Sequence, residues 1–326
     1  MLQQFDERNR DIQVFIKDRL YPRDEAKVSV FDSSVQGGDA VWEGLRVYPE
    51  GIVCLDKHLT RLHESAKTLA FVDIPSKQFI KEAIKKTLDA NGMNDEVHIR
   101  LTLTRGEKIT SGMDPRVNQN GSCLIVLAEW KPLVYDNSGG IKVISSSQRR
   151  NAPQFLDSKI HHANLLNNIL AKIQANVAGK DAGLMLDERG FVAELNGSNV
   201  FMVKDNVIFT PEHRDILRGI SMYTVINDLA PALGLTVVKK NIEPFDVYEA
   251  DEAFLTSTPF CILPAVKLNG LKIGDGKPGK ITKKLLKAWS DLVGVDIVKQ
   301  IKSWDEKNKT GTTPYMFVDN NTLTKD

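Results

Sequence analysis

The stretch AGLMLDERGFVAELNGSNVFMVKDNVIFTP, residues 182–211, decides the fold of the second half of this chain. Its short apolar runs are separated by DERG at 187–190 and KDN at 204–206, which are typical turn sequences. The pattern predicts an antiparallel meander of short strands. Apolar periodicity predicts the other elements of this half, which are strands at 141–147 and within 252–270, and helices at 219–234, 280–293 and 296–303.

A further helix is predicted after Lys159, within SKIHHANLLNNILAKIQANV at 158–177. Its apolar residues recur at helical spacing and would share one face: Leu165, Leu166, Ile169, Leu170 and Ile173. Lys159 would then stand at the start of the helix. Neighbouring residues of a helix point about 100° apart, so His161 and His162 would not share a metal ion in the usual i, i+4 way. We interpret them as packing groups near the lysine, and we predict no metal site.

The first half predicts a smaller lobe. Its expected elements are strands within 27–55 and at 96–106 and 122–130, and amphipathic helices at 57–71 and 77–92. The second helix would turn Phe79, Ile80, Ala83, Ile84 and Leu88 inward and end at Gly92. Strands and helices are mixed without regular βαβ alternation, which favours an α+β fold with two lobes and antiparallel or mixed sheets.

The expected domains are a small N-terminal α/β lobe at 1–130, a linker at 131–140, a larger C-terminal lobe at 141–305 and a polar tail at 306–326. The chain has 326 residues and a net charge of +1, which provides no electrostatic basis for a nucleic-acid or membrane partner. Its three cysteines, Cys54, Cys123 and Cys261, are odd in number and far apart. This pattern argues against a disulfide framework and favours a reducing, cytoplasmic compartment.

Four stretches of the second half carry groups that suit one cofactor. Lys159 offers an amine, and Glu194 offers a carboxylate where a strand ends in AELNGSNVF. LRGIS at 217–221 opens a helix with outward-facing backbone N–H groups, and TSTPF at 256–260 is a turn rich in hydroxyl groups. Pyridoxal 5'-phosphate needs such a set: a lysine for its aldehyde, an acid for its ring nitrogen and an anion cup for its phosphate.

From about Val28 to Leu286 the sequence resembles the fold-type IV pyridoxal-phosphate enzymes. These include branched-chain and D-amino acid aminotransferases, some (R)-amine transaminases and aminodeoxychorismate lyase. ELNGSNVF at 194–201 is similar to the family's signature, and KHLTRLHESAKTLAF at 57–71 is similar to its phosphate-binding helix. The resemblance implies a two-lobed, D-amino acid aminotransferase-like fold whose larger lobe has mixed sheets and a barrel-like core. It also implies a homodimer, with the active site between the lobes and completed by a loop of the second subunit.

The resemblance assigns roles residue by residue. Lys159 would be the Schiff-base lysine and the base that moves the substrate proton, and Glu194 would pair with the ring nitrogen. The remaining cofactor contacts would come from Arg61 on the phosphate, Leu217 on the ring, and Gly219, Ile220, Ser221 and Thr258 around the phosphate.

The substrate pocket is assigned by likeness to the branched-chain group. AVWEGLRVY at 40–48 is close to that group's VFEGIR motif. The likeness implies that Trp42 and Arg46 line the substrate pocket. EVHIRLTL is similar to the strand of that group that carries a pocket arginine, which makes Arg100 a candidate. His98 lies on the same face of this strand. DPRVNQ instead resembles the loop of D-amino acid aminotransferases whose arginine binds the substrate carboxylate, which makes Arg116 the alternative.

Three positions depart from the branched-chain pattern. His98 stands where that group has a tyrosine, and Leu165 stands where it has the tyrosine that binds the cofactor's phenolic oxygen. Pro259 lies in the turn whose backbone N–H groups usually hold the substrate carboxylate, and proline has no N–H.

The resulting hypothesis is a transaminase that moves an amino group from an L-branched-chain amino acid to 2-oxoglutarate in a ping-pong cycle. A transaminase for D-amino acids or (R)-amines is the alternative, and aminodeoxychorismate lyase comes third. A non-catalytic relative that binds pyridoxal phosphate is the hypothesis from another class.

Overall fold

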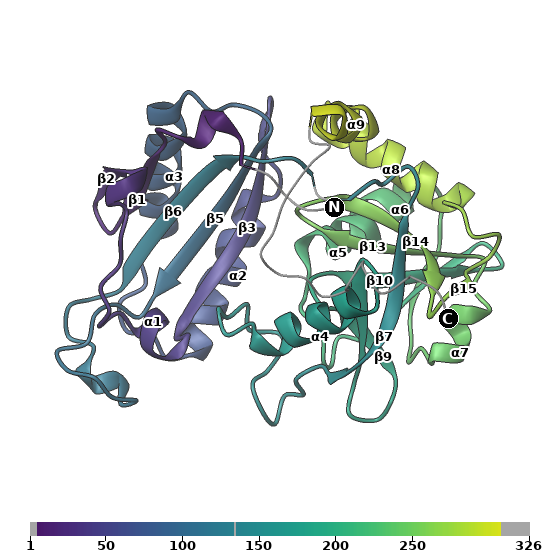
Figure 1. Cartoon of the computed structure of the whole chain (residues 1–326), viewed down its shortest axis with the longest axis horizontal. Coiled ribbons are helices and arrows are strands. Elements are labelled where there is room, and N and C mark those ends of the chain that lie inside the picture. Colours follow the sequence, from purple (N-terminus) through teal and green to yellow (C-terminus); the bar gives the residue numbers. More distant parts are fainter. Residues whose placement is uncertain (1–4, 134, 308–326) are drawn as a thin grey trace, which may run out of the picture. The chain divides into compact units, whose positions relative to one another are not determined.

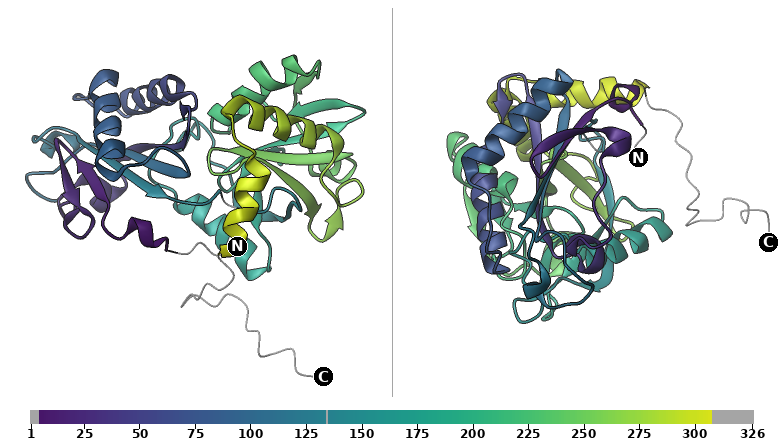
Figure 2. Two further views of the ribbon diagram at one scale, coloured as in Figure 1. Left: turned by 90° about the horizontal axis from the view of Figure 1, so that it is seen from above. Right: turned by 90° about the vertical axis from the view of Figure 1, so that its left-hand side faces the viewer.

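The computed structural model describes residues 5–133 and 135–307 (Figures 1 and 2). It divides into two compact units. The first comprises Phe5–Pro132 together with Lys159–Leu165, and the second comprises the described residues among 133–158 together with 166–307. Residues 308–326 of the predicted tail lie outside the described residues. No helix of the described part is both long and apolar enough to cross a membrane.

The first unit contains a six-stranded antiparallel sheet in the order β2-β1-β6-β5-β3-β4. Its strands are β1 (Gln13–Ile16), β2 (Arg19–Pro22), β3 (Ala40–Tyr48), β4 (Gly51–Ile52), β5 (Val97–Thr104) and β6 (Cys123–Trp130). Its α-helices are α1 (Ser33–Gly37), α2 (Leu55–Thr68) and α3 (Lys77–Asn91).

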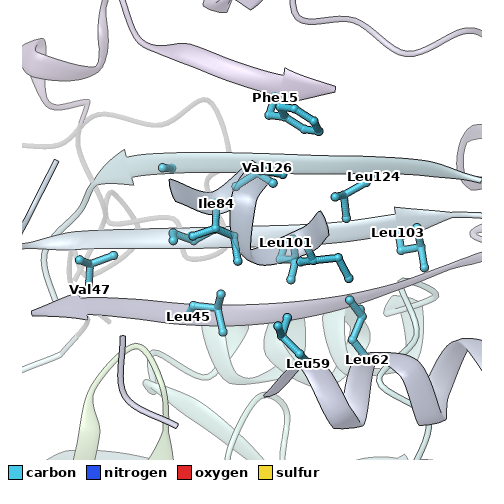
Figure 3. Close-up of a cluster of buried hydrophobic side chains, with 14 of the residues drawn as sticks. Phe15, Leu45, Val47, Leu59, Leu62, Ile84, Leu101, Leu103, Leu124 and Val126 are labelled. Carbon is cyan, nitrogen blue, oxygen red and sulfur yellow. The ribbon is translucent and has the colours of Figure 1, made fainter. Parts of the chain in front are cut away.

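Helices α2 and α3 pack on one face of this sheet. Leu59 and Leu62 of α2 and Ile84 of α3 meet Leu45 and Leu101 of the strands, and all five are buried (Figure 3). Because side chains alternate along a strand, the neighbours of Leu45 and Leu101 project from the opposite face. That face carries Trp42 and Arg46 of β3 and His98 and Arg100 of β5, whereas Glu43 shares the helix-covered face with Leu45.

Two details of the predicted first lobe were wrong. Residues 27–38 form no strand: Asp32 accepts a hydrogen bond from the Ser34 N–H at 2.8 Å and so begins helix α1. Phe79, predicted inward on α3, is 40% exposed in the first turn of the helix. Gly92 does end α3, with a left-handed φ of 63°.

The second unit contains a nine-stranded mixed sheet within the described residues, in the order β12-β11-β10-β13-β14-β7-β8-β9, with β15 paired to β14. The strands are β7 (Ile141–Arg149), β8 (Ala182–Leu186), β9 (Val192–Leu195), β10 (Asn199–Lys204), β11 (Val207–Thr210), β12 (Val237–Lys239), β13 (Glu252–Ser257), β14 (Cys261–Leu268) and β15 (Leu271–Lys272). The helices are α4 (Leu166–Val177), α5 (Ile220–Thr224), α6 (Ala230–Ala232), α7 (Pro244–Tyr248), α8 (Lys280–Val293) and α9 (Ile297–Lys307), with a π-helical turn (Val225–Leu229) between α5 and α6.

The predicted meander is wrong as a single run of neighbouring strands: its strands form two hairpins, β8–β9 and β10–β11, and β13, β14 and β7 lie between them in the sheet. Asp205 and Asn206 both have positive φ, which gives the two-residue turn that matches the twist of the hairpin β10–β11. An isolated bridge joins Leu195 of β9 to Ser198, the residue before β10, so a tight turn leads from β9 into β10.

Helix α4 packs through a face other than its largest apolar one. Ala171 and Ala175 are buried, whereas Leu166, Ile169 and Leu170 are 47–68% exposed. The small residues are needed because a Cβ at Gly183 of β8 would stand 2.8 Å from the Ala171 carbonyl oxygen. Helix and strand backbones therefore approach closely, and the leucine-rich face points away from this contact.

Candidate active site

Lys159 begins a short segment that pairs with β3 rather than a helix, contrary to the prediction. The Trp42 N–H donates to the His161 carbonyl at 2.9 Å, and the Ala163 N–H donates to the Ala40 carbonyl at 2.8 Å. These bonds attach Lys159–Leu165 to the first unit, although the sequence had placed them in the C-terminal lobe. Helix α4 begins only at Leu166.

Arg61 lies in a buried polar cluster beside this segment. Its Nε donates to Glu43 Oε1 at 2.8 Å and its Nη2 donates to Glu43 Oε2 at 2.6 Å. The ring of His58 shares the second oxygen at 2.7 Å, and Nδ1 of His161 lies 3.3 Å from both Glu43 Oε1 and Arg61 Nη2. Glu43 has no solvent exposure. Its carboxylate contacts three side chains, those of His58, Arg61 and His161.

The charges in this cluster determine its protonation. Burial would by itself raise the pKa of Glu43, but Arg61 and His161 next to it lower that pKa well below its ordinary value. Burial lowers the pKa of His161 to about 4, with Glu43 opposing the shift. At neutral pH the cluster therefore consists of an ionised carboxylate, a guanidinium and a neutral His161 ring.

Trp42 and Arg100 stack beside His161. The Arg100 guanidinium carbon lies 3.4 Å from the centre of the Trp42 ring. The centres of the Trp42 and His161 rings are 4.2 Å apart, at an interplanar angle of 35°. The structure thus brings Trp42 and Arg100 together with the Lys159 segment, as the sequence required for a common pocket. Burial lowers the pKa of Arg100 to about 10, which leaves it charged at neutral pH.

The other pocket candidates of the first unit differ in their surroundings. Arg46 is buried and donates to the Lys131 carbonyl at 2.5 Å, a contact that ties β3 to the end of β6. His98 faces Gly44: a Cβ at Gly44 would stand 3.2 Å from the His98 ring and 3.4 Å from the Trp42 ring. Burial next to cationic Lys131 lowers the pKa of His98 to about 3. His98 is thus a neutral wall next to Trp42.

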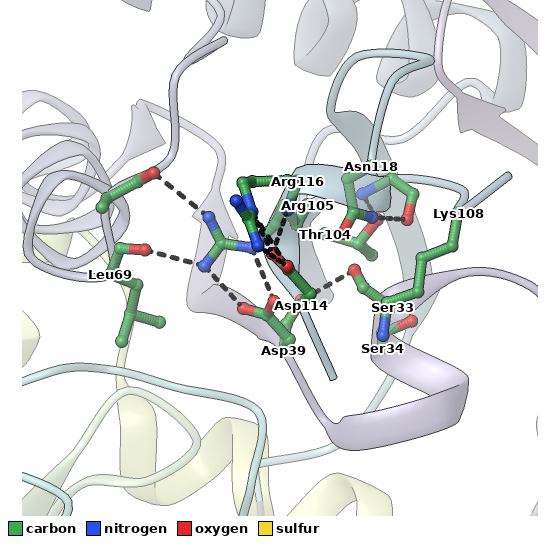
Figure 4. Close-up of polar contacts among 12 residues, drawn as sticks. Ser33, Ser34, Asp39, Leu69, Thr104, Arg105, Lys108, Asp114, Arg116 and Asn118 are labelled. Carbon is green, nitrogen blue, oxygen red and sulfur yellow. Dashed lines mark hydrogen bonds and ion pairs between the residues drawn. The ribbon is translucent and has the colours of Figure 1, made fainter. Parts of the chain in front are cut away.

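Arg116 lies on an exposed loop and pairs with Asp114 (Figure 4). Its side chain is 89% exposed and is bound to Asp114, which accepts from Arg116 Nε at 2.9 and 3.0 Å. The base of the loop is fixed by Arg105, which donates to Asp39 at 2.6 Å and to the Leu69 carbonyl at 2.7 Å.

Glu194 lies in the second unit, buried at the end of β9. Arg150 Nε donates to one carboxylate oxygen. The other oxygen accepts from Asn199 Nδ2 at 2.9 Å and from the Leu217 N–H at 3.2 Å. Hydrogen bonds from a cation and two amides favour the ionised carboxylate.

Three of the predicted phosphate residues, Gly219, Ile220 and Ser221, form the start of α5. Gly219 precedes this helix without a side-chain cap, so the first N–H groups of the helix, including those of Ile220 and Ser221, have no acceptor within it. A Cβ at Gly219 would stand 1.9 Å from Asn199 Oδ1, so the glycine is required by the residue that holds Glu194. Thr258 is half-buried in the turn after β13, and Pro259 follows it.

Sequence reasoning missed three residues of these clusters. Arg150 follows the exposed Arg149, and nothing in QRRNAP shows which of the two arginines is buried. Asn199 lies inside the motif ELNGSNVF, and its spacing of five residues from Glu194 was the available signal. Glu43 lies within AVWEGLRVY, where the sequence analysis considered only Trp42 and Arg46. His161, interpreted from the sequence as a group that packs near the lysine or supports the residues around it, does pack on Trp42 and contact Glu43 and Arg61.

Three comparisons with known proteins bear on these clusters. The model of the family "Amino-transferase class IV" matches residues 40–268. The chain belongs to the class IV aminotransferases. The chain is 50% identical over 87% of its length to "Branched-chain-amino-acid aminotransferase-like protein 2" of Arabidopsis thaliana, but the match spans only 51% of that relative, so the chain corresponds to about half of the plant protein. It is 38% identical to the "Putative branched-chain-amino-acid aminotransferase" of Methanocaldococcus jannaschii, with 86% of this chain and 96% of that protein covered.

A solved structure with a TM-score of 0.79 and 27% identity is the branched-chain amino acid aminotransferase of Thermobaculum terrenum in its PLP-bound holo form. The comparison covers 91% of this chain and 98% of that one. The fold-type IV architecture is thus confirmed, and pyridoxal phosphate is the cofactor of this family.

The residues present in each unit fit this cofactor. Glu194 is a buried carboxylate kept ionised by Arg150, which suits a protonated ring nitrogen. The uncapped start of α5 suits a phosphate, and Arg61 supplies a guanidinium in the unit that carries Lys159. Within the described residues, no cluster of three or more His, Cys, Asp or Glu side chains has the arrangement of a metal site.

Proposed function

We propose that this aminotransferase moves the amino group of an L-branched-chain amino acid to 2-oxoglutarate in a ping-pong cycle. The observation that carries the substrate class is the Arg100–Trp42 stack. Within the described residues Arg100 makes no hydrogen bond or ion pair, although its guanidinium is partly buried. A guanidinium with unused donors beside an indole ring suits a substrate with a carboxylate and an apolar side chain.

Pyridoxal phosphate, when bound, supplies an aldehyde for the amino group and a ring that accepts electron density. We propose that Lys159 Nζ holds the cofactor and then takes the proton from the substrate Cα. Glu194, kept ionised by Arg150, would hold the proton of the ring nitrogen. Arg61 would bind the phosphate together with the backbone N–H groups of Ile220 and Ser221.

The hydroxyl groups of Ser221 and Thr258 would add phosphate contacts, and Leu217 would pack on the cofactor ring. Trp42 and His98 would line the side-chain pocket. Arg46 is assigned to the pocket only by the resemblance, because its observed contacts tie β3 to β6.

The carboxylate of the substrate has two candidate partners. Arg100 is favoured because it is stacked in place, whereas Arg116 is exposed and already paired with Asp114. Pro259 removes one backbone donor from the turn after β13. This loss, and Leu165 in place of a tyrosine, are the reasons to retain the D-amino acid or (R)-amine alternative.

We also propose a homodimer. The exposed apolar face of α4 supports an interface, since Leu166, Ile169, Leu170 and Val177 are 47–68% exposed in the single chain. A cytoplasmic location is proposed from the cysteine pattern alone.

The proposal is tested by half-reactions. Protein loaded with pyridoxal phosphate is mixed separately with L-leucine, L-glutamate, D-alanine, D-glutamate and (R)-1-phenylethylamine, and the visible band of the bound cofactor and the keto product are followed. We expect conversion with L-leucine and L-glutamate, and none with the Lys159→Ala variant. Conversion with the D-amino acids or the amine alone would replace this proposal by the alternative.

A further inference from the structure

Five side chains of the first unit form one continuous column. Arg100 lies 3.4 Å from the centre of the Trp42 ring, and Trp42 lies 4.2 Å from the His161 ring. Nδ1 of His161 is 3.3 Å from Glu43, and Glu43 binds Arg61 through both oxygens. The column therefore joins the arginine proposed for the substrate carboxylate to the arginine proposed for the cofactor phosphate.

Trp42 is held from both sides. A guanidinium 3.4 Å and an imidazole 4.2 Å from one ring centre would overlap if they lay on the same face, so they sandwich the indole. The Trp42 Nε1–H also donates to the His162 carbonyl at 3.1 Å. The indole can therefore change its orientation only if these contacts break.

His161 links the two parts of the column: its ring stacks on Trp42, and its Nδ1 hydrogen-bonds within the Glu43–Arg61 ion pair. Its neutral ring carries one proton, and either tautomer ties it to the ion pair. With the proton on Nδ1 it donates to Glu43; without it, Nδ1 accepts from Arg61 Nη2. The backbone of His161 is fixed as well, because its N–H donates to Ser65 Oγ at 3.1 Å and its carbonyl accepts from Trp42.

We propose that His161 is a positioning residue that sets both arginines at once: Arg61 through Glu43, and Arg100 through Trp42. This inference rests on the proposed function, in which Arg61 binds the phosphate. Cofactor affinity and recognition of the substrate carboxylate would then both depend on one imidazole that lies two residues after Lys159.

Two variants separate the two halves of the column. His161→Phe keeps a ring against Trp42 and removes the bond to the ion pair. His161→Asn keeps an amide where Nδ1 stands and removes the ring. His63→Asn, on the same helix as Arg61 but half-buried, is the matched control. Thermal melting of each protein shows that it is folded.

The first readout is the ratio of the dissociation constants of pyridoxal and pyridoxal phosphate, which isolates the contribution of the phosphate. We expect His161→Phe to lower this ratio about tenfold, as for the loss of a hydrogen bond to a charged group. His161→Asn and the control should keep the wild-type ratio. A structural role without positioning would weaken both ligands equally.

The second readout is KM. We expect His161→Asn to raise the KM for both L-leucine and L-glutamate about fivefold, because Trp42 and Arg100 lose their support. His161→Phe should leave both KM values near those of the wild type.

Arg61→Ala separates this inference from the proposed function. If Arg61→Ala leaves the ratio of the dissociation constants of pyridoxal and pyridoxal phosphate unchanged, the assignment of Arg61 to the phosphate is wrong. If Arg61→Ala abolishes the phosphate preference while His161→Phe keeps it, the positioning role is overturned and the proposed function stands. If His161→Phe does not fold, unchanged KM values for both amino acids in His161→Asn overturn the proposal.

Discussion

Replacing Glu43 by Gln tests the physical basis of the buried cluster. The substitution preserves the volume of the side chain but removes its charge. Arg61 is 8% exposed and would remain a buried cation without its carboxylate. Breaking a buried ion pair by removal of one partner costs about 3–5 kcal/mol. Because the glutamine oxygen still accepts one hydrogen bond, we expect a loss near 3 kcal/mol in the free energy of unfolding.

The assay is denaturant unfolding of the cofactor-free protein, with thermal melting alongside. For a chain of 326 residues, a loss of this size corresponds to a fall of about 4 °C in Tm. Glu64→Gln, on the exposed side of α2, is the control and should change stability by no more than about 0.5 kcal/mol. The double variant Glu43→Gln/Arg61→Met should recover much of the loss, because the unpaired cation is gone.

The stability difference between wild type and Glu43→Gln should also depend on pH, in a direction that follows from the pKa of Glu43. The pKa of folded Glu43 is lowered, so its stabilisation is present above the ordinary glutamate pKa and is lost as pH falls through the lowered value. The difference between wild type and Glu43→Gln should therefore shrink in acid. A Glu43→Gln variant as stable as the Glu64→Gln control at neutral pH would refute the reasoning.

Three further outcomes are expected. Gly219→Ala places a Cβ 1.9 Å from Asn199 Oδ1, so thermal melting should show a loss of about 1–3 kcal/mol and titration should show weaker binding of pyridoxal phosphate. Arg150→Met leaves buried Glu194 without its cation and should cost about 3–5 kcal/mol in denaturant unfolding. The pKa of buried His161 is about 4, below its ordinary 6.5, so the unfolded state binds the proton first and stability falls as pH drops between these values, by about 3 kcal/mol for this group. Unfolding measured from pH 7 to 4 should be less pH-dependent in His161→Asn than in wild type.

Local signals in the sequence were sufficient for most elements. The helix at 57–71 corresponds to α2, and the turn residues at 204–206 join β10 to β11. These elements follow from periodicity and turn chemistry within a few residues. Periodicity could not predict which face of α4 is buried, because that packing depends on Gly183, a residue of strand β8. The sequence likewise gives no sign that Lys159–Leu165 pairs with β3, more than a hundred residues away.

The candidate site shows the same division. The sequence could nominate Glu194 and Lys159 through motifs, but it could not identify the partners that determine their chemistry. Arg150 and Arg149 are alike in sequence, and only the fold buries one of them. Glu43 interacts with Arg61 across 18 positions of the chain, a contact that arises because α2 packs on β3. The resemblance to class IV aminotransferases supplied roles, and the structure supplies the contacts.

The most direct test of the central claim is to identify the lysine that holds the cofactor. Borohydride reduction of protein loaded with pyridoxal phosphate, followed by proteolysis and mass spectrometry, locates the phosphopyridoxyl group. The account predicts the modification on Lys159 and its loss in Lys159→Ala. Modification of another lysine, or none while the visible cofactor band is present, would contradict it.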